Sequence, residues 1–171
     1  MRNRRTMLII QSLIIAGLYV LLTFIFEDFS FHEAQVRVSE ALTILPAFTP
    51  GAVPGLFAGC LISNILNKAP VIDILLGSFA TLIAAVFTFL LTKKLPGAKP
   101  WLLPIPPIVI NALVVPVILR QGYGIMTPYS KMMLTVGRGQ IISCGLFGLL
   151  LYFFLNKYGR TSRKPSRNDR G

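Results

Sequence analysis

Residues that could carry acid–base or metal chemistry are scarce in this chain. Its 171 residues include one histidine, two cysteines and six acidic residues. The sequence has no His-Glu-x-x-His zinc motif, no Gly-x-Ser-x-Gly nucleophile motif and no glycine-rich phosphate loop ending in Lys-Ser or Lys-Thr. His32 has no second metal-ligand type at a suitable spacing, so we interpret it as a solvated loop residue. We therefore predict no catalytic residue, no metal site and no cofactor.

The two cysteines also argue against a covalent or metal clip. Cys60 and Cys144 each stand alone inside an apolar stretch, far apart in the sequence. Neither has a partner at the spacing of a metal site or of a disulfide framework. We predict that both are small buried hydrophobic residues.

Charge is sparse compared with apolar surface. Hydrophobic residues make up 54% of the chain, charged residues 13%, and the mean hydropathy is +0.69. Soluble domains are about 45–50% apolar and about 25% charged. Four stretches approach or exceed the roughly 20 apolar residues that cross a bilayer: residues 7–26, 71–92, 101–119 and 132–155. The composition therefore predicts an all-α integral membrane protein.

The net charge of +11 comes from basic residues that gather at the chain ends and in one connection. They are not interleaved with aromatic residues on one face, so nucleic-acid binding is a weak interpretation. Cytoplasmic segments of membrane proteins are enriched in Lys and Arg. We therefore predict that both termini are cytoplasmic, together with the connection that contains Lys93, Lys94 and Lys99.

The region 41–67 is apolar but interrupted by Pro46, Pro50 and Pro54, so it is one kinked helix or two short helices. One helix would give five crossings and leave the basic tail outside the cell. Two helices, with a turn near residues 49–51, keep both termini inside. We predict the second arrangement: six transmembrane helices within residues 1–158 and a basic, disordered cytoplasmic tail at 159–171. Half-length helices at membrane depth are tolerated where they line a cavity.

Polar side chains within or beside the apolar stretches are candidate binding residues, because burying them in lipid is costly. Glu40, at the start of a short apolar helix, is the strongest candidate. Alternatives remain for its neighbours: Arg37 could simply pair with Glu40, Asp73 could be an N-cap, and Arg138 could extend to the interface. The candidate set is Gln35, Arg37, Glu40, Asn64, Asp73, Asn111, Arg138 and Gln140.

Three segments resemble a known family: QVRVSEALTILP at 35–46, FTPGAVPGLFAGCLISN at 48–64 and DILLGSFATL at 73–82. They are similar to the QueT-like queuosine-precursor transporters, which are substrate-binding S components of energy-coupling factor (ECF) transporters. The resemblance covers roughly residues 8–155. It implies a multi-pass protein of the bacterial plasma membrane that binds a 7-deazaguanine such as preQ0 or preQ1. It also implies two kinds of partner, a transmembrane coupling subunit and two ATPase subunits.

The resemblance assigns roles to particular residues. The first apolar helix is similar to the small-residue motif by which S components dock on the coupling subunit, with Ser12 and Ala16 in the small positions. Glu40 fits a carboxylate that accepts hydrogen bonds from the ring N–H and exocyclic amine of the base. Asp73 fits a partner for an aminomethyl cation. The family pattern tends to read Gly-Glu where this chain has Gly139 and Gln140.

Other functions remain open at this point. One alternative is an S component for another water-soluble vitamin, which the Gln140 difference leaves open. A second is a membrane scaffold subunit in which the polar side chains only join helices. An intramembrane enzyme is disfavoured, because an acid, a base and a nucleophile are not found together.

Overall fold

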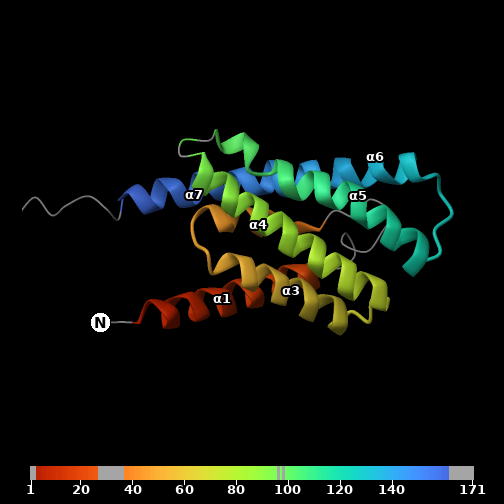
Figure 1. Cartoon of the computed structure of the whole chain (residues 1–171), viewed down its shortest axis with the longest axis horizontal. Helices are drawn as coiled ribbons and strands as arrows, with labels where there is room; N and C mark the ends of the chain where they lie inside the picture. The colour runs from red at the N-terminus through yellow and green to blue at the C-terminus, as the bar shows by residue number, and fades with distance from the viewer. Residues whose placement is uncertain (1–2, 27–36, 96, 98, 162–171) are drawn as a thin grey trace, which may run out of the picture.

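The computed structural model describes residues 3–26, 37–95, 97 and 99–161, and every regular element within them is helical (Figure 1). The prediction of an all-α protein is therefore confirmed for these residues. The elements are α1 (Arg4–Ile25), η1 (Val38–Ala47), α3 (Ala52–Leu66), η2 (Asp73–Gly77), α4 (Ser78–Lys94), η3 (Pro100–Leu102), α5 (Ile105–Gly122), α6 (Tyr129–Gln140), η4 (Ile141–Phe147) and α7 (Gly148–Thr161).

Four helical segments are long and apolar enough to cross a membrane. They are Arg4–Ile25, Asp73–Lys94, Pro100–Gly122 and Tyr129–Tyr158, the last formed by α6, η4 and most of α7. Large apolar side chains also cover the outside of the bundle, and Leu13, Phe87 and Leu113 are 68%, 54% and 50% exposed. Such a surface is compatible with hydrocarbon and would favour aggregation in water. The protein is a multi-pass membrane protein.

The proline-rich region forms two half-length helices, as predicted. η1 is a 3₁₀ helix that contains Pro46, and α3 follows after a turn at residues 48–51. The Thr49 hydroxyl in this turn donates to Gln11 Oε1 of α1 at 2.6 Å. Gln11 lies seven residues beyond Arg4, which is about 10 Å along α1. The turn therefore ends short of the α1 start, and the prediction of six full crossings stays a prediction.

Glycines let α3 pack closely against α1. A Cβ placed on Gly55 would lie 2.8 Å from the Ser12 carbonyl oxygen, and one on Gly59 would lie 2.7 Å from Tyr19 Cβ. Such contacts are too short for a real side chain, so these positions require glycine at this helix separation. Ala16 is buried at the same interface. The packing fixes the face of α1 that carries Tyr19 toward the interior.

The start of α1 and the end of α7 lie at the same end of the bundle, and α4 also finishes there (Figure 1). This agrees with the prediction that both termini share one side of the membrane, while the cytoplasmic assignment stays a prediction. Most of the predicted disordered tail lies outside the described residues, and α7 continues to Thr161.

Candidate functional site

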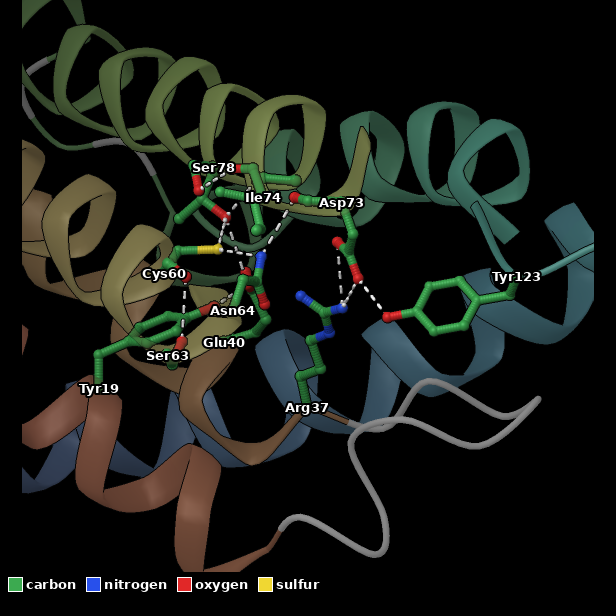
Figure 2. Close-up of polar contacts among 12 residues, drawn as sticks. Tyr19, Arg37, Glu40, Cys60, Ser63, Asn64, Asp73, Ile74, Ser78 and Tyr123 are labelled. Atoms are coloured by element: carbon green, nitrogen blue, oxygen red, sulfur yellow. Dashed lines mark hydrogen bonds and ion pairs between the residues drawn. The ribbon is translucent and has the colours of Figure 1, made fainter. Parts of the chain in front are cut away.

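Glu40 lies at the centre of the bundle and is 1% exposed. It belongs to the first turn of η1, and neutral donors from three other helices surround its carboxylate. The Tyr19 hydroxyl of α1 donates to Oε1 at 2.6 Å, and Figure 2 shows these two side chains meeting. Thr81 of α4 lies 3.4 Å from the same oxygen, and Asn111 of α5 donates to Oε2 at 3.3 Å. The carboxylate is thus a junction between four segments.

A second carboxylate, Asp73, forms a buried ion pair with Arg37. The Arg37 Nη2 atom lies 3.0 Å from Asp73 Oδ2, and both side chains are buried. The Tyr123 hydroxyl donates to the same oxygen at 2.8 Å (Figure 2). Arg37 therefore makes its ion pair with Asp73 and not with Glu40. Asp73 is no N-cap, because the backbone is already helical at Ile72.

The charges of this ion pair are reinforced by its surroundings. Burial alone would lower the pKa of Arg37, but the Asp73 carboxylate, together with smaller contributions from Cys60, Tyr19 and Glu40, outweighs burial and the pKa is raised. Burial and the Asp73 carboxylate together raise the pKa of Tyr123 above its ordinary value. The guanidinium therefore stays charged, and the Tyr123 hydroxyl stays a hydrogen-bond donor over the physiological pH range.

Two π-helical segments carry candidate residues into this region. η2 begins at Asp73, and η4 begins directly after Gln140. The Cys144 thiol of η4 donates to Gln140 Oε1 at 3.1 Å and lies 3.5 Å from the Glu40 carbonyl oxygen. Widened helical turns of this kind occur frequently at functional sites. η2 leads into α4 and η4 leads into α7, and α4, η4 and α7 all pack against η1.

The structure brings most of the predicted site residues together. The Asn64 amide donates to the Asp73 carbonyl oxygen at 3.2 Å, so α3 is connected to η2. Arg138 is exposed on α6 and makes no hydrogen bond or ion pair with the described residues of this cluster, and Gln35 lies outside the described residues. The residues that meet around η1 are Arg37, Glu40, Asn64, Asp73, Asn111 and Gln140.

The remaining predicted residues lie at other places. Ser12 and Ala16, predicted to contact a partner subunit, face α3, and the Ser12 hydroxyl lies 2.8 Å from the Gly51 carbonyl oxygen. Their contact with a partner stays a prediction. Cys60 and Cys144 are free and buried, as predicted. Within the described residues, no group of three or more His, Cys, Asp or Glu side chains could hold a metal ion.

A model of the QueT transporter family matches residues 9–157, which is most of the chain. The chain belongs to the QueT transporter family. It is also 34% identical over 85 residues to the queuosine precursor transporter QueT of Lactococcus lactis subsp. cremoris (strain MG1363). That match covers 48% of this chain and 50% of the relative, so the aligned part spans about half the length of each. No solved structure matches the chain.

The family match confirms the resemblance seen in the sequence, and this family is one of transporters and not of enzymes. A transporter needs groups that bind a solute inside the bilayer without reacting with it. The cluster around Glu40 has this character, because its carboxylate is held by hydroxyl and amide donors that can exchange with donors of a ligand.

Sequence reasoning missed three members of this cluster: Tyr19, Thr81 and Tyr123. Tyr and Thr occur often in membrane helices, so their presence in an apolar stretch carried little signal. A usable signal existed for Tyr19, since it is the only tyrosine between residues 4 and 25 and its hydroxyl needs a partner at membrane depth.

Proposed function

We propose that the protein is the substrate-capture (S) component of an ECF-type importer in the bacterial plasma membrane and that it binds a queuosine precursor, a 7-deazaguanine such as preQ0 or preQ1. The family match and the name of the Lactococcus relative support the substrate class. The single observation that carries the assignment of the site is the buried Glu40 carboxylate, which is surrounded by exchangeable neutral donors.

The chemistry of the base suits this carboxylate. A 7-deazaguanine presents a ring N–H and an exocyclic amine side by side, and a carboxylate accepts both as a fork. Asn111 holds Glu40 Oε2 at 3.3 Å, which is long for an amide hydrogen bond and therefore easily exchanged. The amides of Asn64, Asn111 and Gln140 then supply donors and acceptors for the remaining polar atoms of the base.

Selectivity follows from burial. A ligand that lacks one polar group leaves a buried protein donor or acceptor without a partner, and this costs about 1–3 kcal/mol. The site therefore discriminates against bases that do not match its pattern of donors and acceptors.

Delivery across the membrane requires partners in this proposal. A transmembrane coupling subunit and two ATPase subunits supply the ATP-driven step, while this chain binds the substrate. The described residues offer apolar outer faces on α1 and α4 for such a subunit, and these faces also suit lipid.

The proposal is tested by thermal unfolding of the purified protein in detergent, with and without preQ0 and preQ1. A ligand that binds only the native state raises the unfolding midpoint. Glu40→Gln keeps the side-chain shape but places a donor where the base needs an acceptor, so we expect affinity to fall by about 10–100-fold, equivalent to about 1.5–3 kcal/mol. Lys131→Gln, at an exposed position of α6, is the matched control.

Two outcomes would contradict this proposal. If neither 7-deazaguanine raises the midpoint of the wild-type protein, it does not bind this substrate class. Stabilisation by a different water-soluble vitamin would then favour the alternative S component, and stabilisation by no small molecule would favour a scaffold subunit. If Glu40→Gln and Lys131→Gln both keep wild-type affinity, the site lies elsewhere.

A further inference from the structure

The buried charges of the described residues do not cancel. Among these residues, three charged side chains are buried: Arg37, Glu40 and Asp73. Arg37 and Asp73 are in contact at 3.0 Å and form a neutral pair. Within the described residues, the hydrogen bonds to the Glu40 carboxylate come from neutral hydroxyl and amide groups. Counted by formal charge, the described residues of the cluster carry one negative charge in excess.

Arg37 does not remove this excess. It lies within electrostatic reach of Glu40, yet its guanidinium is in direct contact with Asp73. One cation shared between two carboxylates still leaves a net charge of minus one. A buried carboxylate that lacks a compensating cation is costly, and either a proton or a bound cation relieves that cost.

The resemblance in the sequence assigned a ligand cation to Asp73, but the structure leaves Glu40 as the carboxylate that is more open to a cation. Asp73 accepts hydrogen bonds from Arg37 and Tyr123 on the same oxygen, and Arg37 Nη2 lies 3.4 Å from its other oxygen. A ligand cation at Asp73 would have to compete with a guanidinium already in place. Glu40 has no cationic competitor of that kind at contact distance within the described residues.

We propose that the site selects a positively charged ligand, namely a 7-deazaguanine that carries a protonated primary amine, over neutral 7-deazaguanines of similar size. The Glu40 carboxylate supplies the discriminating charge. Attraction between charges acts without direct contact, so Glu40 can accept hydrogen bonds from the base and also attract the protonated amine. This inference rests on the proposed function.

The test compares three ligands that differ at one substituent. They are the 7-aminomethyl compound preQ1, which is cationic at neutral pH, its neutral 7-hydroxymethyl analogue of nearly equal size, and the neutral 7-cyano compound preQ0. Dissociation constants are measured by calorimetry on the full chain in detergent at neutral pH. We expect preQ1 to bind the wild-type protein at least about tenfold more tightly than the hydroxymethyl analogue, a difference of about 1.4 kcal/mol.

Two variants separate charge from hydrogen bonding. Glu40→Gln removes the excess charge, so the ratio of the two dissociation constants should fall toward one. The double variant Arg37→Gln/Asp73→Asn removes one positive and one negative charge and keeps the excess. Its ratio should stay near the wild-type ratio, whatever the change in absolute affinity. If Glu40→Gln abolishes all binding, the proposal is tested by the ratio of the two dissociation constants in the wild-type protein alone.

The outcomes distinguish this inference from the proposed function. Equal wild-type affinities for preQ1 and the hydroxymethyl analogue overturn charge selection and leave the transport of 7-deazaguanines intact. Charge selection by Glu40 is also overturned if the double variant loses the preference for preQ1 while Glu40→Gln keeps it. The discriminating charge would then be that of Asp73. Failure of all three ligands to bind overturns both proposals.

Discussion

The Tyr123 hydroxyl joins the end of α5 to the Asp73 carboxylate at the start of η2. The hydroxyl donates this bond, so it must keep its proton. Burial and the Asp73 carboxylate raise the pKa of Tyr123 in the folded state. A group whose pKa is raised on folding contributes stability that is complete below its unfolded value, about 10 for tyrosine. That contribution is lost as the pH rises through the folded value.

We therefore predict that Tyr123→Phe lowers the thermal midpoint at neutral pH and weakens its alkaline decline. The loss at neutral pH should be modest, about 1 kcal/mol, because the side chain is only half-buried. The difference between the two proteins should shrink above pH 10, where the hydroxyl in the unfolded wild-type chain begins to lose its proton while the folded protein keeps it. The measurement is the unfolding midpoint in detergent between pH 7 and pH 11. Parallel curves over this range would contradict the role given to this bond.

The sequence predicted which residues belong to the site better than it predicted which of them contact each other. Glu40, Asp73 and Asn111 stood out because charged and amide groups are rare in apolar stretches. The pairing of Arg37 with Asp73 was not predictable, since the two residues lie 36 positions apart and only the folded bundle brings η2 to the residue that precedes η1. Sequence spacing instead favoured Glu40, three residues away.

At the scale of elements, the contact between α1 and α3 controls the position of Tyr19. A Cβ on Gly59 would lie 2.7 Å from Tyr19 Cβ and 3.1 Å from the Ala16 carbonyl oxygen. These neighbours are a backbone atom and the first atom of a side chain, so neither can rotate away. Separation of the two helices would move Tyr19, and with it the hydroxyl that holds Glu40.

We predict that Gly59→Ala destabilises the protein by about 1–3 kcal/mol, the usual cost of overpacking, and weakens ligand binding. Gly17→Ala is the matched control, because a Cβ at this exposed position of α1 meets nothing within 4 Å. It should leave stability unchanged or raise it by up to about 1 kcal/mol, since alanine favours helix more than glycine does. Thermal unfolding of both variants, with and without ligand, provides the measurement. Equal effects of the two substitutions would show that the close contact is unimportant.

The helical segments themselves were largely predictable, whereas their local geometry was not. Proline spacing and charge parity correctly indicated two short helices around residues 49–51. The 3₁₀ geometry of η1 and the π turns of η2 and η4 depend on contacts between segments, to which apolar periodicity is insensitive. These three irregular elements carry Glu40, Asp73 and Cys144, so the least predictable backbone belongs to the site.

At the scale of the whole molecule, the half-length pair η1 and α3 determines how many times the chain crosses the membrane. η1 enters from the end where α1 finishes, and α3 returns toward that end after the turn that contacts Gln11. If the pair crosses, the chain crosses six times; if it only enters and returns, the four long segments give four crossings. Both counts are even. The shared side of the termini therefore does not depend on how deep the turn at Thr49 lies.

The distribution of basic residues predicts that this side is cytoplasmic. Lys99 in the connection before α5 and Gln121 at the end of α5 are both exposed and lie at opposite ends of this helix. We predict that a membrane-impermeant maleimide labels Gln121→Cys in intact cells and labels Lys99→Cys only after permeabilisation. The native cysteines give little background, because both are buried. The reverse pattern would contradict the predicted orientation and place the termini outside the cell.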